Sequence, residues 1–203
     1  DTGARRVAKN ALAPMVLSLF NRMLDFVFAT FSNRVLGPTE VGNYAFAVII
    51  FGWFDTITNY GLNLLLTREV AGDKARANRW LINTTALRLW LGLAIIPFFA
   101  GGLLGLNALA GAAQPLGITL QPLDDRTLLA IALLILAQAP GTVSTGLTAL
   151  FYAYEKAEYP AAIATVTTML KIVFGVAALT LGYSIVGLAA ASLIVNVLTL
   201  IML

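Results

Sequence analysis

The sequence contains no cysteine and no histidine, and it has few charged residues. The first two absences exclude disulfide bonds, thiolate nucleophiles, histidine general bases and most zinc or haem ligation by this chain. Charged residues make up only 11% of the 203 positions, whereas hydrophobic residues make up 59%, and the mean hydropathy is +0.85. Soluble domains do not have this balance, so the composition indicates a protein of the lipid bilayer.

Six long apolar segments, bounded by charged residues, proline or glycine, divide the chain. They cover residues 11–33, 44–67, 81–106, 127–154, 160–181 and 185–203. A membrane-spanning helix needs about 20 apolar residues, and these segments are too long and too uniformly apolar for the strands of a membrane barrel. We therefore expect an all-α integral membrane protein with six transmembrane helices in a single lobe. The last segment has no polar cap or basic anchor, so we expect a second half of the protein to follow.

The basic residues outside these spans are divided unevenly between the two sides of the membrane. With the amino terminus inside, eight of them lie in the cytoplasm: Arg5, Arg6, Lys9, Arg68, Lys74, Arg76, Arg79 and Lys156. Only Arg34 and Arg126 then lie outside. Because cytoplasmic loops of membrane proteins are rich in Lys and Arg, we expect a multi-pass protein of the cytoplasmic membrane with a cytoplasmic amino terminus. The net charge of +3 is a property of this topology and does not indicate nucleic-acid binding.

Five charged residues fall within the predicted spans. Arg22 and Asp25 lie in the middle of the first span, Asp55 in the middle of the second and Lys171 in the middle of the fifth. A charge at mid-bilayer costs about 2.5–3.5 kcal/mol even on the lenient insertion scale, so these side chains should face the bundle interior or a water-filled cavity. Arg88 lies closer to the cytoplasmic start of its span, so its long side chain can reach the interface by snorkelling and the residue ranks lower as a cavity candidate.

Uncharged polar residues accompany these charges at helical spacing. In the first span they are Ser18, Asn21 and Ser32; in the second, Thr56, Asn59 and Asn63; in the fifth, Thr167 and Thr168. Two interpretations stay open. In one, Asp55 pairs with Lys171 and Arg22 pairs with Asp25, and both pairs only hold the bundle together. In the other, the faces line a hydrated cavity for a polar cargo.

In the cavity interpretation, Arg22, Arg88 and Lys171 bind phosphate oxygens, since guanidinium groups bind them bidentately. Asp25 and Asp55 tune these cations or bind a coupling Na⁺ or H⁺, and Asn59 lies in the same polar stripe. Glycines within the spans, Gly61 and Gly175 among them, are interpreted as positions of close helix packing rather than of bending. The adjacent Asp124 and Asp125 suggest either an acidic catalytic or metal site or, as we prefer, favourable charges at a helix amino terminus.

Several stretches in order resemble the polysaccharide-biosynthesis flippases, the oligosaccharide branch of the superfamily that also contains multidrug extruders and lipid II flippases. They are residues 5–10 (RRVAKN), 34–45 (RVLGPTEVGNYA), 59–62 (NYGL), 67–71 (TREVA), 151–159 (FYAYEKAEY) and 182–191 (GYSIVGLAAA). The resemblance implies two six-helix lobes around a V-shaped cavity, of which this chain is the amino-terminal lobe, as in multidrug/toxic-compound extruders. It also implies alternating access and a cargo of polyprenyl-pyrophosphate-linked oligosaccharide, with Arg22 as a cargo-contacting cation.

We therefore expect a flippase and not an enzyme, with no metal and no cofactor apart from a coupling ion. Its partners are the lipid-linked oligosaccharide, membrane lipid and, as a further expectation, polysaccharide-assembly enzymes at the cytoplasmic loops. The alternatives are a cation-coupled multidrug or metabolite extruder, a lipid II flippase and, more remotely, a membrane glycosyltransferase that would use Asp124 and Asp125.

Overall fold

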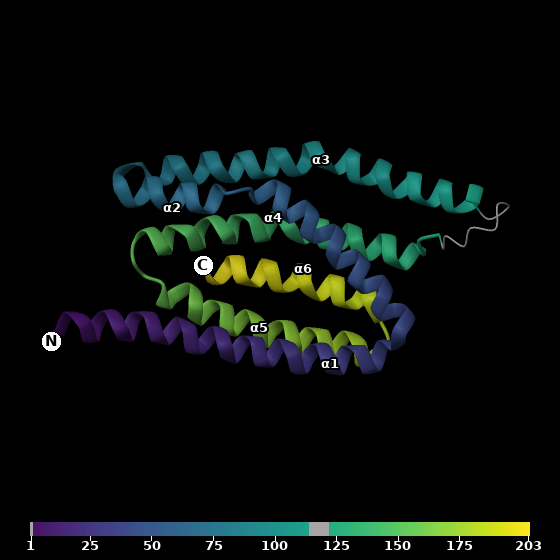
Figure 1. The fold of residues 1–203 in the computed structure, drawn as a ribbon, viewed down its shortest axis with the longest axis horizontal. Helices are drawn as coiled ribbons and strands as arrows, with labels where there is room; N and C mark the ends of the chain where they lie inside the picture. The colour runs from purple at the N-terminus through teal and green to yellow at the C-terminus, as the bar shows by residue number, and fades with distance from the viewer. Residues whose placement is uncertain (1, 114–121) are drawn as a thin grey trace.

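The computed structural model describes the backbone of residues 2–113 and 122–203 and the side chains of residues 15–110, 112 and 122–203. Within these ranges the chain is helical and contains no strand, so the prediction of an all-α protein is confirmed. The helices are α1 (Thr2–Asn59), α2 (Leu62–Gly72), the short 3₁₀ helix η1 (Lys74–Arg76), α3 (Ala77–Ala113), α4 (Asp125–Ala153), α5 (Glu158–Thr180) and α6 (Ser184–Met202), as Figure 1 shows. The side chains of Arg5, Arg6 and Lys9, and part of the predicted third connection, lie outside the described residues.

Helix α1 is interrupted at Gly37, where the backbone is not helical (φ 74°, ψ 169°). Figure 1 shows α1 reversing its direction at the end of the molecule opposite the amino terminus. The sequence predicts a loop between residues 33 and 44, but the helix continues on both sides of this one glycine. A glycine adopts positive φ without steric cost, and Pro38 directly after it suits the first turn of a new helix. The described residues thus contain five stretches long and apolar enough to cross a membrane, because residues 15–72 form one stretch where we expected two spans.

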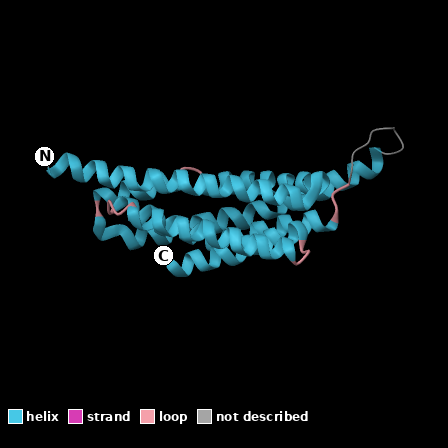
Figure 2. Cartoon of the chain, turned by 90° about the horizontal axis from the view of Figure 1, so that it is seen from below, coloured by secondary structure: helices cyan, strands magenta, loops and turns pink. Residues whose placement is uncertain are grey.

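The helices lie roughly along one direction, and within the described residues Figure 2 shows short loops between them. Helix α4 packs along α6, the amino-terminal arm of α1 packs along α5, and α2 packs against α4. Alanines make up half of the two buried clusters. The first contains Ala47, Ala130, Ile131, Leu134, Ile185 and Ala189, and the second contains Leu66, Val70, Ala149 and Ala153. Close approach of helices at small residues is the usual packing in membranes, where burial of apolar surface drives association only weakly.

The glycines of α5 and α6 show how close this approach is. A Cβ atom at Gly175 would overlap the Phe28 ring of α1, so the interpretation of Gly175 as a packing position is confirmed. A Cβ atom at Gly187 would lie 2.6 Å from Tyr183 Cβ and 2.9 Å from Ala178 Cβ. These neighbouring atoms belong to the stems of their side chains and cannot rotate away.

Replacing Gly187 with alanine should therefore destabilise the protein by about 1–3 kcal/mol, the usual cost of overpacking a core. The measurement is the midpoint of thermal unfolding in detergent. Gly101→Ala is the matched control, because nothing lies within 4 Å of the added methyl group in α3. If the two variants melt at the same temperature, the junction of α5 and α6 is less tightly packed than the structure indicates.

Candidate functional site

The charged residues of the first and fifth predicted spans meet where α1 runs along α5. Lys171 Nζ lies 3.1 Å from Asp25 Oδ1, and the two side chains are 46% and 47% exposed. The pairs of the bundle-holding interpretation, Asp55–Lys171 and Arg22–Asp25, are not formed, since Lys171 pairs with Asp25. The reason is the packing of the helices: α5 lies beside the amino-terminal arm of α1, whereas Asp55 lies on the other arm, beyond Gly37.

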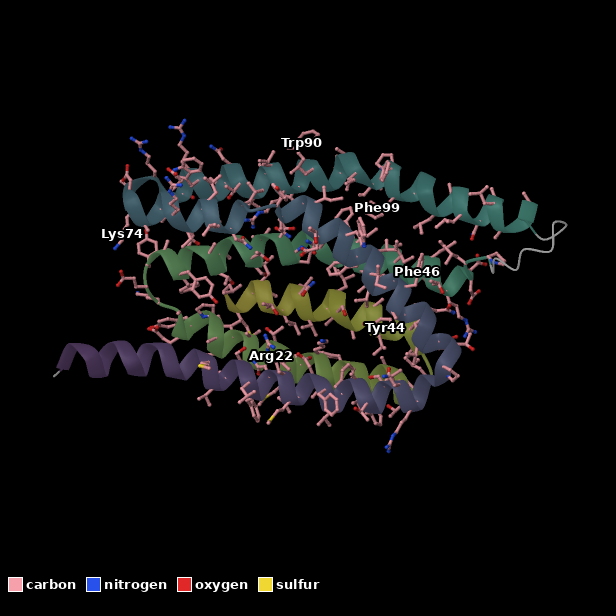
Figure 3. The ribbon with its side chains drawn as sticks, in the orientation of Figure 1. Arg22, Tyr44, Phe46, Lys74, Trp90 and Phe99 are labelled. Carbon is pink, nitrogen blue, oxygen red and sulfur yellow. The ribbon has the colours of Figure 1, made fainter. Side chains whose placement is uncertain are left out.

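Arg22 lies one turn from Asp25 on the same helix, and its side chain is exposed. Within the described part of the chain, it makes no hydrogen bond and no salt bridge. Figure 3 shows Arg22 on the arm of α1 that lies along α5. Nearby, Asn21 Nδ2 donates to Thr165 Oγ1 at 3.3 Å and so fixes one edge of the same helix pair. We call Arg22, Asp25 and Lys171 the exposed charged group.

Exchanging the charges of Asp25 and Lys171 tests whether this pair is a structural ion pair. We expect each single reversal, Asp25→Lys or Lys171→Asp, to lower the free energy of unfolding by about 1 kcal/mol, because the half-exposed pair is partly screened by water. The double reversal should recover most of that loss. Thermal unfolding of all four proteins measures it. A double variant as unstable as the sum of the single variants would show that the contact contributes nothing to stability.

Asp55 belongs to a second, more enclosed group. Its Oδ1 accepts hydrogen bonds from Asn59 Nδ2 at 2.5 Å, one turn along α1, and from Gln138 Nε2 of α4. Gln138 is only 7% exposed and was not among the residues singled out from the sequence. Its signal was a lone amide in the middle of an apolar span, two residues before Pro140. An amide at that depth needs a partner from a neighbouring helix, and Asp55 supplies it.

Arg88 is the most buried charge among the described side chains, with 1% of its surface exposed. Its Nη2 donates to Asn63 Oδ1 at 2.6 Å, and its Nη1 lies 3.5 Å from the Thr142 carbonyl oxygen. Arg88 therefore does not use the possibility of snorkelling to the interface. The side chain points across the bundle to α4, where its Nη1 approaches the Thr142 carbonyl oxygen.

A break between α1 and α2 brings Asn63 to Arg88. Helix α1 ends at Asn59, α2 begins at Leu62, and Gly61 between them has a left-handed backbone (φ 66°, ψ −4°). Nothing lies within 4 Å of a Cβ atom built on Gly61, so its interpretation as a packing position is wrong. Gly61 instead allows the chain to bend between α1 and α2, because it adopts the left-handed backbone conformation found there. Arg88 and Gln138 are buried and Asp55, Asn59 and Asn63 are half-buried, and we call these five residues the buried polar cluster.

The two acidic residues before α4 lie where the helix-dipole interpretation puts them. Asp124 is the N-cap residue and Asp125 is in the first turn, where negative charge is favourable. In the part of the chain that the structure describes, no three acidic side chains are grouped as metal ligands would be.

Comparison with known proteins gives one match. The model of a family described as "Polysaccharide biosynthesis protein" matches residues 7–203, nearly the whole chain. No curated protein and no solved structure matches the sequence.

Proposed function

Because the chain belongs to the polysaccharide biosynthesis protein family, we propose that it forms one lobe of a flippase for polyprenyl-pyrophosphate-linked oligosaccharide. The observation that carries the proposal is the exposed charged group on α1 and α5. An arginine in the middle of an apolar helix is not stable against lipid, so the exposed face that carries Arg22 borders water or a polar cargo. A pyrophosphate linkage is such a cargo, and a guanidinium group is its preferred partner.

The pairing of Asp25 with Lys171 supports this role for Arg22. If Asp25 paired with Arg22, the face would carry no free guanidinium. Since Lys171 neutralises Asp25 at 3.1 Å instead, the exposed charged group has a net charge of one cation, and that cation is Arg22. Arg88 does not add to this face, because its side chain is buried on the other side of the bundle. Arg22 is thus the cargo contact in our proposal.

The proposed arrangement in the membrane treats the two arms of α1 as separate crossings, which gives six in all. Figure 1 places the amino terminus, the α2–α3 turn and the α4–α5 turn at one end of the molecule. Lys74, Arg76 and Lys156 lie in these turns, so we assign this end to the cytoplasm. A second six-helix lobe would complete the cavity, and the two lobes would rock in alternating access. Asp25 and Asp55 are the candidates for binding a coupling Na⁺ or H⁺.

Flux across proteoliposomes tests the function. The full-length protein is reconstituted, and a fluorescent polyprenyl-pyrophosphate oligosaccharide is followed from one leaflet to the other, with protein-free liposomes as the control. We expect flux that depends on the protein and increases with an imposed ion gradient. Protein-dependent efflux of a cationic dye without movement of the sugar lipid would instead indicate an extruder. Cleavage or transfer of the sugar would indicate a glycosyltransferase.

A further inference from the structure

A cavity of about 480 Å³ lies between α3, α4 and the carboxyl-terminal arm of α1, on the side of the bundle away from the exposed charged group. On α3 its lining extends from Arg88 to Leu103, and on α4 from Leu128 to Thr142. Fifteen residues of helix measure about 22 Å, so the cavity is long and narrow. Figure 3 shows Phe99 on the side of α3 that faces α1, whereas Trp90 points away from the bundle.

The lining of the cavity is apolar except at one end. Most of it consists of leucine, isoleucine, alanine and phenylalanine side chains, and Phe54 and Phe99 pack together with their ring centroids 5.8 Å apart. The rim is open to the side of the molecule, since Leu93 is 60% exposed and Leu136 is 58% exposed. Four polar residues, Thr58, Arg88, Gln138 and Thr142, line the cavity, and the last three meet at the end where Arg88 approaches the Thr142 carbonyl.

Arg88 has the most unused hydrogen-bond donors of these four and is the only one with a positive charge. Thr58 and Thr142 donate their hydroxyl hydrogens to carbonyls of their own helices, and Gln138 donates to Asp55. Arg88 has five N–H donors but uses two, one of them at 3.5 Å, and its buried Nε has no partner among the described residues. The carboxylate of Asp55 acts on the Arg88 charge from a distance, but no carboxylate in the described part of the chain forms a salt bridge with Arg88 or occupies its free donors.

We propose that this cavity binds a single-chain acidic lipid from the surrounding bilayer, with its apolar chain along α3 and α4 and its acid group on Arg88. The length and polarity of the cavity fit such a molecule: one apolar channel, one open side and one buried cation at its end. A buried guanidinium with unused donors is costly unless an anion completes its hydrogen bonds. The inference does not depend on the proposed transport function, because the site faces away from Arg22.

Spin-labelled stearate and its methyl ester are suitable probes, since they differ only in the acidic group. Electron paramagnetic resonance measures the association of each with the full-length protein in bilayers, at a pH where the carboxylate is ionised. We expect the protein to bind stearate more tightly than the ester. Arg88→Gln should weaken stearate binding about tenfold, as expected for the loss of one hydrogen bond to a charged group, and should leave ester binding unchanged.

Three further variants separate the cavity from general effects. Ala132→Trp adds a large side chain to the lining on α4 and should reduce the binding of both probes. Ala94→Trp, on an exposed part of α3 outside the lining, should change neither. Arg34→Gln removes the same charge from an exposed part of α1 outside the lining and should also leave the binding of both probes unchanged.

Equal binding of stearate and ester by the unmodified protein would overturn the proposal, as would stearate binding that survives Ala132→Trp. Both comparisons hold even if Arg88→Gln fails to fold. If Ala132→Trp stops flux of the sugar lipid but leaves stearate binding intact, the cavity holds the chain of the cargo and the proposal is wrong.

Discussion

Arg22→Ala in the full-length protein should reduce flux of a polyprenyl-pyrophosphate oligosaccharide by about 10- to 100-fold. The expected size follows from one lost charge-assisted hydrogen bond, worth about 1.5–3 kcal/mol, at about 1.4 kcal/mol for each factor of ten. Membrane insertion and thermal stability should not change, because Arg22 makes no hydrogen bond or salt bridge within the described part of the chain. The proteoliposome assay measures the flux, and unfolding in detergent measures the stability.

Two companion variants show whether the effect belongs to this position. Arg22→Lys keeps the charge but loses bidentate binding, so it should retain part of the flux. Arg34→Ala removes an exposed arginine near the turn of α1 and should leave flux unchanged. Normal flux in Arg22→Ala, or a marked loss of thermal stability, would show that Arg22 is not a cargo contact.

The helical nature of the chain could be predicted from the sequence because the bilayer leaves few alternatives. A long apolar segment must satisfy its own backbone groups, and a helix does so. The turn after the first span was harder to predict, since it needs only Gly37 in a non-helical conformation. The charged residues, proline and glycine between the first two apolar segments suggested a loop, yet the helix continues on both sides of Gly37. Local composition does not distinguish a one-residue turn from a ten-residue loop.

The charged residues were predicted to avoid lipid, but their partners could not be read from helical spacing. Spacing describes one helix at a time, whereas the choice of Asp25 by Lys171 depends on which arm of α1 lies beside α5. Arg88 shows the same limit. Its distance from the predicted interface allowed snorkelling. However, the bend at Gly61 brings Asn63 Oδ1 within 2.6 Å of Arg88 Nη2, and this hydrogen bond keeps the guanidinium inside the bundle. Both outcomes were decided by contacts between helices.

Replacing Arg88 with methionine should lower the free energy of unfolding by about 1–3 kcal/mol, the cost of leaving a buried hydrogen-bond acceptor without its donor. The substitution leaves Asn63 Oδ1 without its donor at 2.6 Å. It also removes the one cation of the buried polar cluster and leaves the Asp55 carboxylate as an uncompensated negative charge. Thermal unfolding in detergent is the measurement. Arg79→Met, at the exposed start of α3, is the matched control and should change stability by less than about 0.5 kcal/mol.

A second substitution identifies which of these two effects dominates. If the cost of Arg88→Met comes from the Asn63 amide oxygen that loses its donor, adding Asn63→Leu removes that oxygen and should recover part of the stability. Replacing both members of a buried hydrogen bond costs less free energy than replacing one. If the cost comes from the unbalanced carboxylate, adding Asp55→Asn should recover more. Stability unchanged by Arg88→Met would contradict both explanations. The buried arginine would then not hold the bend at Gly61 in place, and its retention in the cavity would have to be explained by ligand binding alone.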